Sequence, residues 1–447
     1  MKRVLEVLAL CLFLVLPVIA GAGEPITLSY GAPTGSTDWK TVKMFFPAFE
    51  AQYPDIKMKD VGYPRQGYEE RLLAQFAAKA SEVDFFTEWA SGEEFEDRDY
   101  LIPLDGSYDP NIKASDELLK KVYPHLLKLF TYPQFPMPGR TPRLYMMPIN
   151  SSDAMLLIYR EDLIKQAGLP GPPKTWNDRI TYGQKLTRDI NGDGIIDIYG
   201  DAFFASRKIM MGKEIVNSFL NALLTAGGQY LDAKGMPAFN SEAGVKALQY
   251  LCDLKNKYKT VPPGIMTYTY ADIRDLLGSG KLAMGENWTA AWIWADGDPA
   301  SQARGKLMIA PIPYLVKPGS YTHAGALAIP KASKHPREAW TFIRYMMLES
   351  VQTLFHLTLL DHTSLPSVFK SPEVQAFLSP RNRQMLDTYD TIARNSSPLP
   401  LFRGSSKVIR VLGDQLEQAY NQQVTPKQAL DTAAQEARKI IQEELGR

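Results

Sequence analysis

Short apolar runs alternate with amphipathic segments along the first part of the chain. The stretch PITLSYG (25–31) has strand composition, and the apolar residues after it recur at helical spacing, at Val42, Phe45, Phe46, Phe49 and Tyr53. Two further strands are predicted in DIKMKDVGYP (55–64) and VDFFTEW (83–89), with a helix between them in YEERLLAQFAAKA. This βαβαβ order predicts a parallel sheet covered by helices on both faces.

The pattern changes near residue 100 and later returns. The segment 100–150 is rich in Pro and Tyr and predicts irregular connections with a helix near 115–130. AMLLIYREDLIKQAGLP (154–170) then predicts a strand running into a helix that Gly168 and Pro170 end. The chain is helix-rich to about 305, with GVKALQYLCDLKNKY as the clearest helix and KLAMGEN as a short strand.

The last third repeats the strand-to-helix order. A strand in HAGALAIP leads to a helix in PREAWTFIRYMM, and two amphipathic helices follow near 405–421 and 426–445. We therefore predict an α/β fold of two lobes that the chain crosses more than once. On such sheets, ligands bind beyond the carboxyl ends of the strands.

Composition agrees with a two-lobed globular protein. The chain has 447 residues, of which 45% are hydrophobic and 22% charged, and this is too long for one ordinary core. The net charge is +1, and no long run of Lys and Arg interleaves with aromatic residues. A nucleic-acid partner is therefore not expected.

The first 22 residues have the features of a cleaved secretory signal peptide. A basic start at Met1-Lys2-Arg3 precedes the apolar stretch VLALCLFLVLPVIA, and Ala20-Gly21-Ala22 supplies small residues for cleavage. An uncleaved anchor is the alternative, although Pro17 interrupts the run; lipid attachment at Cys11 is a weaker one. After cleavage Cys252 is the only thiol, so no internal disulfide is expected.

Three tryptophans follow predicted strands, each beside a carboxylate or amide. The pairs are Asp38 with Trp39, Glu88 with Trp89, and Asn287 with Trp288. A sugar ring has one apolar C–H face and an edge of hydroxyl groups, so a sugar site needs aromatic planes and polar side chains together. One such pair could be coincidence, but three at equivalent places favour sugar binding. Trp176 and Trp340 lie in or at predicted helices, and we assign them to packing.

The stretch NWTAAWIWADGD (287–298) holds three tryptophans. On a helix, Trp288 and Trp292 are about 40° apart while Trp294 points elsewhere, and in a strand all three share one face. We therefore expect Trp292 to be the neighbour of Trp288 at the ligand and Trp294 to belong to the core.

The segment DINGDGIIDIYG (189–200) resembles much of a calcium loop. The candidate ligands are Asp189, Asn191, Asp193, Asp197 and the carbonyl of Ile195. The twelfth position is Gly200, where a bidentate Glu is required. A tight turn without metal explains the same residues, so calcium and the turn both stay open.

Catalytic signals are weak, and no cofactor is expected beyond this candidate calcium. The chain contains no Gly-x-Ser-x-Gly, no His-Glu-x-x-His, no phosphate-binding Gly-rich loop and no Cys pair for zinc. Ser367 to Lys370 match Ser-x-x-Lys without the accompanying Lys-Thr-Gly. The acidic stretch GEEFEDRD (92–99) could contain a glycosidase pair, but a solvated helix start is the more ordinary explanation.

Several segments together resemble one family. LIYREDLIKQAGLPGPPKTW, LTRDINGDGIIDIYG, LLGSGKLAMGENW and KHPREAWTFIRYMM are similar, in this order, to segments of the extracellular solute-binding proteins of family 1, the sugar receptors of ABC importers. The chain departs from the family pattern at Arg160-Glu161-Asp162, at Val83, and at Gly325-Ala326, where Gly-Gly is usual.

The resemblance implies two α/β lobes of the periplasmic-binding-protein kind, joined by crossover strands around a central cleft. It places the N-terminal lobe at 23–155 plus 312–368 and the C-terminal lobe at 156–311 plus 369–447. Positions that match the family's binding places are Asp38, Trp39, Glu88, Trp89, Tyr159, Asn287, Trp288 and Gly325. It further implies a monomer outside the cytoplasm or in the periplasm, which closes on a saccharide and delivers it to a membrane permease without catalysis.

Two other functions stay open. A receptor for a cationic solute such as a polyamine would use Asp38 and Glu88 against ammonium groups, with the tryptophans as a cage. A secreted carbohydrate-active enzyme would use the acidic stretch 92–99 and would release product from an oligosaccharide.

Overall fold

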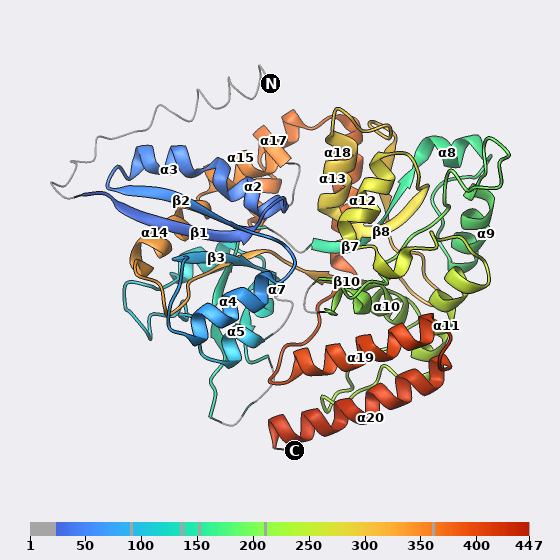
Figure 1. Ribbon diagram of the computed structural model, residues 1–447. Helices are drawn as coiled ribbons and strands as arrows, with labels where there is room; N and C mark the ends of the chain where they lie inside the picture. Colours follow the sequence, from blue (N-terminus) through green and yellow to red (C-terminus); the bar gives the residue numbers. More distant parts are fainter. Residues whose placement is uncertain are drawn as a thin grey trace. The chain divides into compact units, whose positions relative to one another are not determined.

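The protein divides into two compact units (Figure 1). The computed structural model describes residues 24–89, 93–134, 137, 139–150, 153–209, 212–359 and 363–446. Unit 1 contains the described residues before Asp153 together with Ala324–Leu378, and unit 2 contains Asp153–His323 and the chain from Ser379 onward. The chain thus passes between the units three times, which confirms the prediction of more than one crossing.

The crossings differ from the boundaries expected at 155, 311 and 368. The second lies between His323 and Ala324, because β9 (Leu307–Ala310) and β10 (Ser320–His323) both pair with β7 (Asp153–Arg160) of unit 2. The third lies between Leu378 and Ser379, because the helices just before it belong to unit 1.

Unit 1 is built on a five-stranded sheet of order β2-β1-β3-β11-β6. Its strands are β1 (Ile26–Pro33), β2 (Ile56–Tyr63), β3 (Phe85–Glu88), β6 (Met146–Pro148) and β11 (Ala326–Ala328). β1 is parallel to β2 and β3, as predicted, but β11 enters from the second half of the sequence and is antiparallel to both β3 and β6. The sheet is therefore mixed.

Helices of unit 1 come from both of its chain segments, with a small β4 (Thr131–Tyr132) and β5 (Arg143–Leu144) hairpin beside them. The helix predicted through Val42 and Tyr53 is two helices, because Pro47 has no N–H for the helical ladder. The helices are α2 (Thr37–Met44), α3 (Phe46–Gln52), α4 (Tyr68–Ala77), α5 (Glu94–Asp97), α6 (Asp116–Lys121), α7 (Pro124–Leu129), α14 (Pro336–Met346), α15 (Glu349–Leu359), α16 (Pro366–Phe369) and α17 (Pro372–Phe377).

Unit 2 is organised around β7. This strand pairs antiparallel with β8 (Met284–Trp288) and also with β9 and β10, and β12 (Ser396–Ser397) extends the sheet beside β10. The parallel sheet predicted from the strand and helix order does not hold here. The reason is that the strands neighbouring β7 return from later parts of the chain in the opposite direction.

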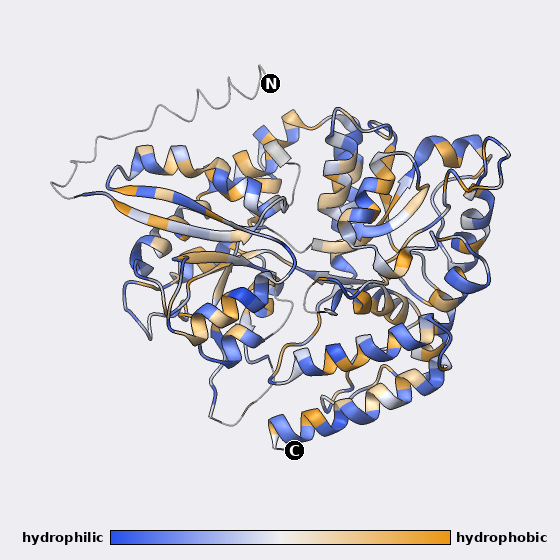
Figure 2. Ribbon diagram, viewed as in Figure 1, coloured by the Kyte–Doolittle hydropathy of each residue, from blue (hydrophilic) through white to orange (hydrophobic). Residues whose placement is uncertain are grey.

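Unit 2 is the helix-rich part, as expected. Its helices are α8 (Glu161–Gln166), α9 (Trp176–Leu186), α10 (Glu214–Thr225), α11 (Glu242–Asn256), η2 (Ile265–Thr267), α12 (Tyr270–Gly278), α13 (Thr289–Gly297), α18 (Pro380–Arg394), α19 (Ser405–Tyr420) and α20 (Pro426–Leu445). Figure 2 shows hydrophobic and hydrophilic residues interleaved along α19 and α20, which agrees with the predicted amphipathic helices.

Two further sequence predictions concern the membrane and the thiol. No helix in the described ranges is long and apolar enough to cross a bilayer. Residues 1–23, which include the predicted signal peptide and Cys11, lie outside the described residues. Cys252 is a buried free cysteine in α11, and burial raises the pKa of its thiol to about 12, which disfavours the reactive thiolate.

Candidate functional site

The turn after β1 brings Asp38 into a buried cluster of unit 1. Ser36 caps α2 by accepting a hydrogen bond from the backbone N–H of Trp39, at 3.1 Å, and this fixes the first helical turn. Asp38 lies in that turn and is 5% exposed. One of its carboxylate oxygens accepts a hydrogen bond from the indole N–H of Trp89, at 2.7 Å, and the other from the amide of Asn150, at 3.1 Å.

Gly325 completes this group, which we call the Asp38 cluster: Asp38, Trp89, Asn150 and Gly325. The side-chain oxygen of Asn150 accepts a hydrogen bond from the backbone N–H of Gly325, at 2.8 Å. A Cβ on Gly325 would lie 3.0 Å from both the Asp38 carboxylate and the Asn150 amide, so a larger residue would press on both side chains. Burial raises the pKa of Asp38 to about 6, against the opposing effect of the Trp89 hydrogen bond.

Trp89 is held at the end of β3 by residues on either side of α4's N-terminus. The Tyr68 ring meets the Trp89 ring edge-on, with centroids 6.2 Å apart, and the Tyr68 hydroxyl donates to the carbonyl of Thr87 at 2.8 Å. The Arg65 guanidinium lies 5.1 Å from the centroid of the Trp89 ring and pairs with the buried Glu69. Trp89 is therefore a partly buried aromatic plane of fixed orientation.

The two remaining residues predicted for unit 1 are Trp39 and Glu88. Trp39 donates its indole N–H to Asp60, at 2.8 Å, and the ammonium of Lys43 lies 3.7 Å from the centroid of its ring. Glu88 is buried at the end of β3, where it lies opposite Ala326 of β11. The indole that bonds to Asp38 is thus that of Trp89, not that of its sequence neighbour Trp39.

In unit 2, Trp288 ends β8 and lies within an aromatic group. The centroids of Phe204, Tyr321 and His323 lie 6.0, 5.8 and 4.1 Å from that of Trp288. We call these four residues the Trp288 cage. Trp288 is 6% exposed, so its side chain is buried.

Asn287 makes its side-chain contacts with the main chain. Its amide nitrogen donates to the carbonyl of Tyr270, at 2.9 Å, and its oxygen accepts from the backbone N–H of Trp288, at 2.8 Å. These bonds hold the turn from β8 into α13. The polar group expected beside Trp288 for a ligand is engaged in fixing the backbone of Trp288.

Trp292 is buried like Trp288, whereas Trp294 is the more exposed of the two residues on α13. Trp292 is 4% exposed and donates its indole N–H to the carbonyl of Leu307, at 3.2 Å, so it packs α13 against β9. Trp294 lies on the same helix and is partly exposed. The prediction that Trp294 belongs to the core is wrong because the segment after Trp288 is a helix, whose buried face is formed by Ala291, Trp292 and Ala295.

Tyr159 is not brought next to Trp288. The register of β7 and β8 places Tyr159 opposite Met284, whereas Trp288 lies opposite Met155. Four strand positions correspond to roughly 13 Å. Burial raises the pKa of Tyr159 to about 12, which is consistent with a core residue of the sheet.

Sequence reasoning missed four residues of these groups: Asn150, Phe204, Tyr321 and His323. Asn150 follows β6, so the rule of looking beyond strand ends would have found it had the segment 100–150 not been taken as irregular. Tyr321 and His323 lie on β10, just before the second crossing. No sequence signal marks Phe204, which lies in the buried connection that follows Asp201.

Comparisons with known proteins identify the family. The model of the bacterial extracellular solute-binding protein family matches residues 34–353. The chain belongs to this family.

Two relatives and one solved structure show the extent of the similarity. The mannitol-binding protein of Pseudomonas aeruginosa is 26% identical over 339 residues, which cover 74% of this chain and 70% of that protein. The arabinooligosaccharide-binding protein of Bacillus subtilis is 28% identical over 314 residues, covering 63% and 64%. The structure of T. maritima MalE3 with maltose bound has a TM-score of 0.78 at 23% identity, covering 93% of this chain and all of that one. This last likeness confirms the two-lobed α/β fold.

The candidate calcium loop of this solute-binding protein is held by its own main chain. Both carboxylate oxygens of Asp189 accept backbone N–H groups, from Gly192 at 2.7 Å and Gly194 at 2.8 Å. Asp197 accepts from the N–H of Ile190, and the oxygens of Asn191 and Asp193 accept from N–H groups within the loop. In the described ranges no three His, Cys, Asp or Glu residues are grouped so as to hold a metal ion. The turn interpretation accounts for these contacts, and calcium stays a prediction.

The acidic stretch is more buried than expected. Glu93, Glu94 and Glu96 are 4%, 8% and 2% exposed, so the interpretation as a solvated helix start is wrong for these three. Burial raises the pKa of Glu96 well above its ordinary value, and the nearby Glu88 raises it further. Gly92 of this stretch lies outside the described residues.

A cavity of about 280 Å³ lies elsewhere in unit 2. Its lining is mainly apolar and includes Pro172, Pro173, Pro311, Ile312, Pro318 and Ile392. A saccharide needs several polar groups for its hydroxyls, and none of the predicted ligand residues lines this cavity. Each unit of this solute-binding protein thus has one candidate group for ligand binding, the Asp38 cluster in unit 1 and the Trp288 cage in unit 2.

Proposed function

We propose that this solute-binding protein is the receptor of an ABC importer and binds a sugar, a sugar alcohol or a short oligosaccharide. The observation that carries the proposal is the Asp38 cluster, in which a buried carboxylate and amide fix an indole plane at the carboxyl ends of β1 and β3. Aromatic planes beside carboxylate and amide groups suit the apolar face and the hydroxyl edge of a sugar ring. The named ligands of the relatives, mannitol and arabinooligosaccharide, support the same class.

Delivery of the ligand to the permease would need no catalysed reaction. A ligand that contacts both lobes stabilises the closed form of a hinged receptor, and a membrane permease then recognises that form. Family membership agrees with this, because the family consists of binding proteins. The central cleft, the monomeric state and the saccharide partner stay part of the proposal.

Export through the predicted signal peptide belongs to the same proposal and agrees with the extracellular family. Mass spectrometry of the exported protein would give a mature chain that begins close to residue 23. A protein that retains residues 1–22 in the membrane would instead support the uncleaved anchor.

A thermal-shift panel of monosaccharides, sugar alcohols and oligosaccharides tests the ligand class. Ligand at 100 times its dissociation constant adds about 2.7 kcal/mol to the free energy of unfolding. We expect at least one saccharide or sugar alcohol to raise the unfolding midpoint, and calorimetry then gives its affinity. A response to polyamines alone, weakened by salt, would replace the sugar proposal by the cationic-solute receptor.

The alternative that the protein is a carbohydrate-active enzyme can be tested in the same samples. Chromatography after incubation should return each oligosaccharide intact. Release of shorter products, lost on substitution of Glu96→Gln, would identify a carbohydrate-active enzyme.

A further inference from the structure

Helix α10 carries an unusual set of buried polar side chains. Eleven of its residues are buried, and among them Glu214, Ser218 and Asn221 are each 0% exposed. Their spacing of four and then three residues places them on one face of the helix. Burying a polar group costs free energy unless the group is hydrogen-bonded, so each of these three side chains needs a hydrogen-bond partner. We call these three residues the α10 stripe.

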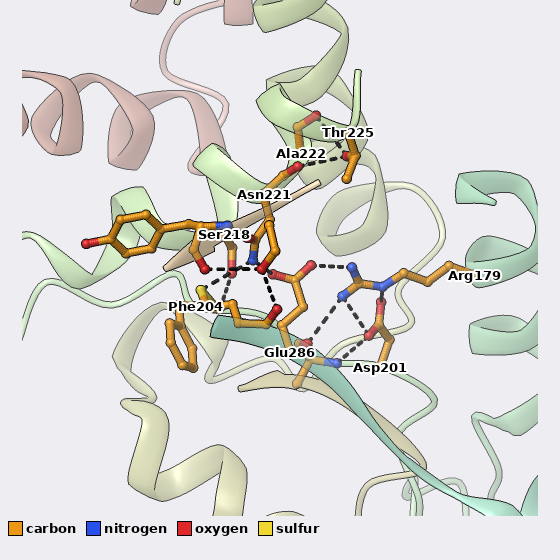
Figure 3. Close-up of polar contacts among 12 residues, drawn as sticks. Arg179, Asp201, Phe204, Ser218, Asn221, Ala222, Thr225 and Glu286 are labelled. Carbon is orange, nitrogen blue, oxygen red and sulfur yellow. Dashed lines mark hydrogen bonds and ion pairs between the residues drawn. The ribbon is translucent and has the colours of Figure 1, made fainter. Parts of the chain in front are cut away.

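Each residue of the α10 stripe accepts a hydrogen bond from the backbone of a different segment. The Ser218 hydroxyl accepts from the N–H of Phe204, at 2.8 Å, and the Asn221 oxygen accepts from the N–H of Tyr321, also at 2.8 Å. Glu214 accepts from the N–H of Tyr270, at 2.9 Å. Figure 3 shows Ser218 and Asn221 one turn apart on the helix, with Phe204 beside Ser218.

Each of the three segments held in this way is connected to Trp288, two by ring contacts and one by hydrogen bonds. The rings of Phe204 and Tyr321 are members of the Trp288 cage. The carbonyl of Tyr270 accepts from the amide of Asn287, whose oxygen in turn accepts from the N–H of Trp288. One helix therefore fixes the backbone of two cage residues directly and that of a third through Asn287.

A buried ion network fixes the stripe itself. The Asn221 amide donates to Glu286 at 3.0 Å, and Glu286 pairs with Arg179. Arg179 also donates two hydrogen bonds to the carboxylate of Asp201, at 2.7 and 2.9 Å (Figure 3). Glu286 precedes Trp288 by two residues on β8, and Asp201 precedes Phe204 by three. The network thus joins the α10 stripe to the two chain segments that carry Trp288 and Phe204.

We propose that the α10 stripe positions the Trp288 cage, so that Ser218 and Asn221 set ligand affinity through Phe204 and Tyr321. The link to affinity rests on the proposed function, in which the Trp288 cage meets the ligand. Both are positioning residues, since their side chains bind backbone groups of the residues that form the cage.

The test compares Ser218→Ala with a matched control, Thr225→Val. Thr225 is also buried on α10, but its hydroxyl bonds only to carbonyls of its own helix, those of Asn221 and Ala222, at 2.8 and 3.1 Å. Both substitutions remove one buried hydroxyl group and keep the side chain small. Only Ser218→Ala releases a cage segment.

The first readout needs no ligand. The difference between the near-ultraviolet circular dichroism of the wild type and that of Trp288→Phe isolates the signal of Trp288. We expect Ser218→Ala to change this signal and Thr225→Val to leave it as in the wild type. A Trp288 signal that Ser218→Ala leaves unchanged would overturn the proposal, even if the variant unfolds at a lower temperature.

The second readout is the dissociation constant of the ligand found in the saccharide panel. We expect Ser218→Ala to weaken binding roughly threefold to tenfold, and Thr225→Val to leave it unchanged. In a Phe204→Leu background the effect of Ser218→Ala should disappear, because Ser218 acts on Trp288 through the Phe204 ring. Equal loss of affinity in Ser218→Ala and Thr225→Val would mean a general structural role and would overturn the proposal.

Asn221→Ser supplies a second variant on the same face, and it should change the Trp288 signal through Tyr321. If this variant does not fold, Ser218→Ala alone decides. Failure of the sugar proposal would look different, since the wild type would then respond to no saccharide while the Trp288 signal would still report on the α10 stripe.

Discussion

The buried carboxyl group of Asp38 makes the stability of the protein depend on pH. It is buried, and its pKa is raised to about 6 from an ordinary 3.8. The folded state therefore binds this proton more tightly than the unfolded state. The stability that the group contributes is fully present below its ordinary pKa and is lost as the pH rises through about 6.

Asp38→Asn should remove this dependence. Between pH 4 and pH 7 the free energy of unfolding of the wild type should fall relative to that of the variant, by up to about 3 kcal/mol for a shift of roughly two pKa units. Denaturant titrations of both proteins across this range measure the difference. Parallel pH profiles would show that Asp38 titrates normally.

Trp288 and Trp292 should respond differently to substitution. Trp288→Ala removes the centre of the Trp288 cage and should weaken sugar binding by about 1–3 kcal/mol. Trp292→Phe removes the indole bond to Leu307 and should lower stability by about 1 kcal/mol with little change in affinity. Calorimetry and thermal unfolding of both variants separate the two roles. An unchanged dissociation constant in Trp288→Ala would exclude it from the site.

At the residue scale, the sequence shows where a residue lies along a strand or helix better than it shows which residue it bonds to. Trp89 and Trp288 could be placed at the ends of β3 and β8 because aromatic residues follow apolar runs, whereas Asp38 lies in the first turn of α2. The hydrogen bond between Asp38 and Trp89 joins residues 51 positions apart. Such a partner depends on how β1 and β3 lie side by side, which no local pattern contains.

At the scale of elements, the loop 189–200 offers a choice between metal and turn. Because its carboxylates already accept backbone N–H groups, we expect the turn to form without calcium. The unfolding midpoint should then be the same in calcium and in a chelator. A midpoint raised by calcium in the wild type but not in Asp193→Asn would establish the metal site instead.

Helices and strands with strong periodicity were predicted closely, and those set by long-range pairing were not. The helices expected near 405–421 and 426–445 are Ser405–Tyr420 and Pro426–Leu445, because each has an apolar face and the second also has a Thr425 cap. β6 is three residues long and was not predicted. It exists because β11 pairs with it, and a strand this short has no period of its own.

At the scale of the whole molecule, three crossings make each unit depend on distant segments. Helices α18, α19 and α20 follow the last crossing and belong to unit 2. The buried face of α19, which includes Val408, Leu412 and Leu416, packs against α10 and α11.

A chain ended after Leu378 should therefore lose the fold of unit 2. The truncation exposes the apolar surfaces of α10 and α11, whereas every strand of the unit 1 sheet is retained. Hydrogen exchange should show protection in unit 1 strands and little in β7 and β8. Retained protection in β8, together with ligand binding, would show that the C-terminal helices are dispensable.

The position of β11 inside the sheet also determines when that sheet can be completed. β11 lies between β3 and β6, yet almost 180 residues separate it from β6 in the chain. While the protein is being synthesised, β3 and β6 emerge long before the strand that joins them, and their open edges are able to pair with other chains. The sheet of unit 1 can therefore be completed only after the chain has been made as far as β11.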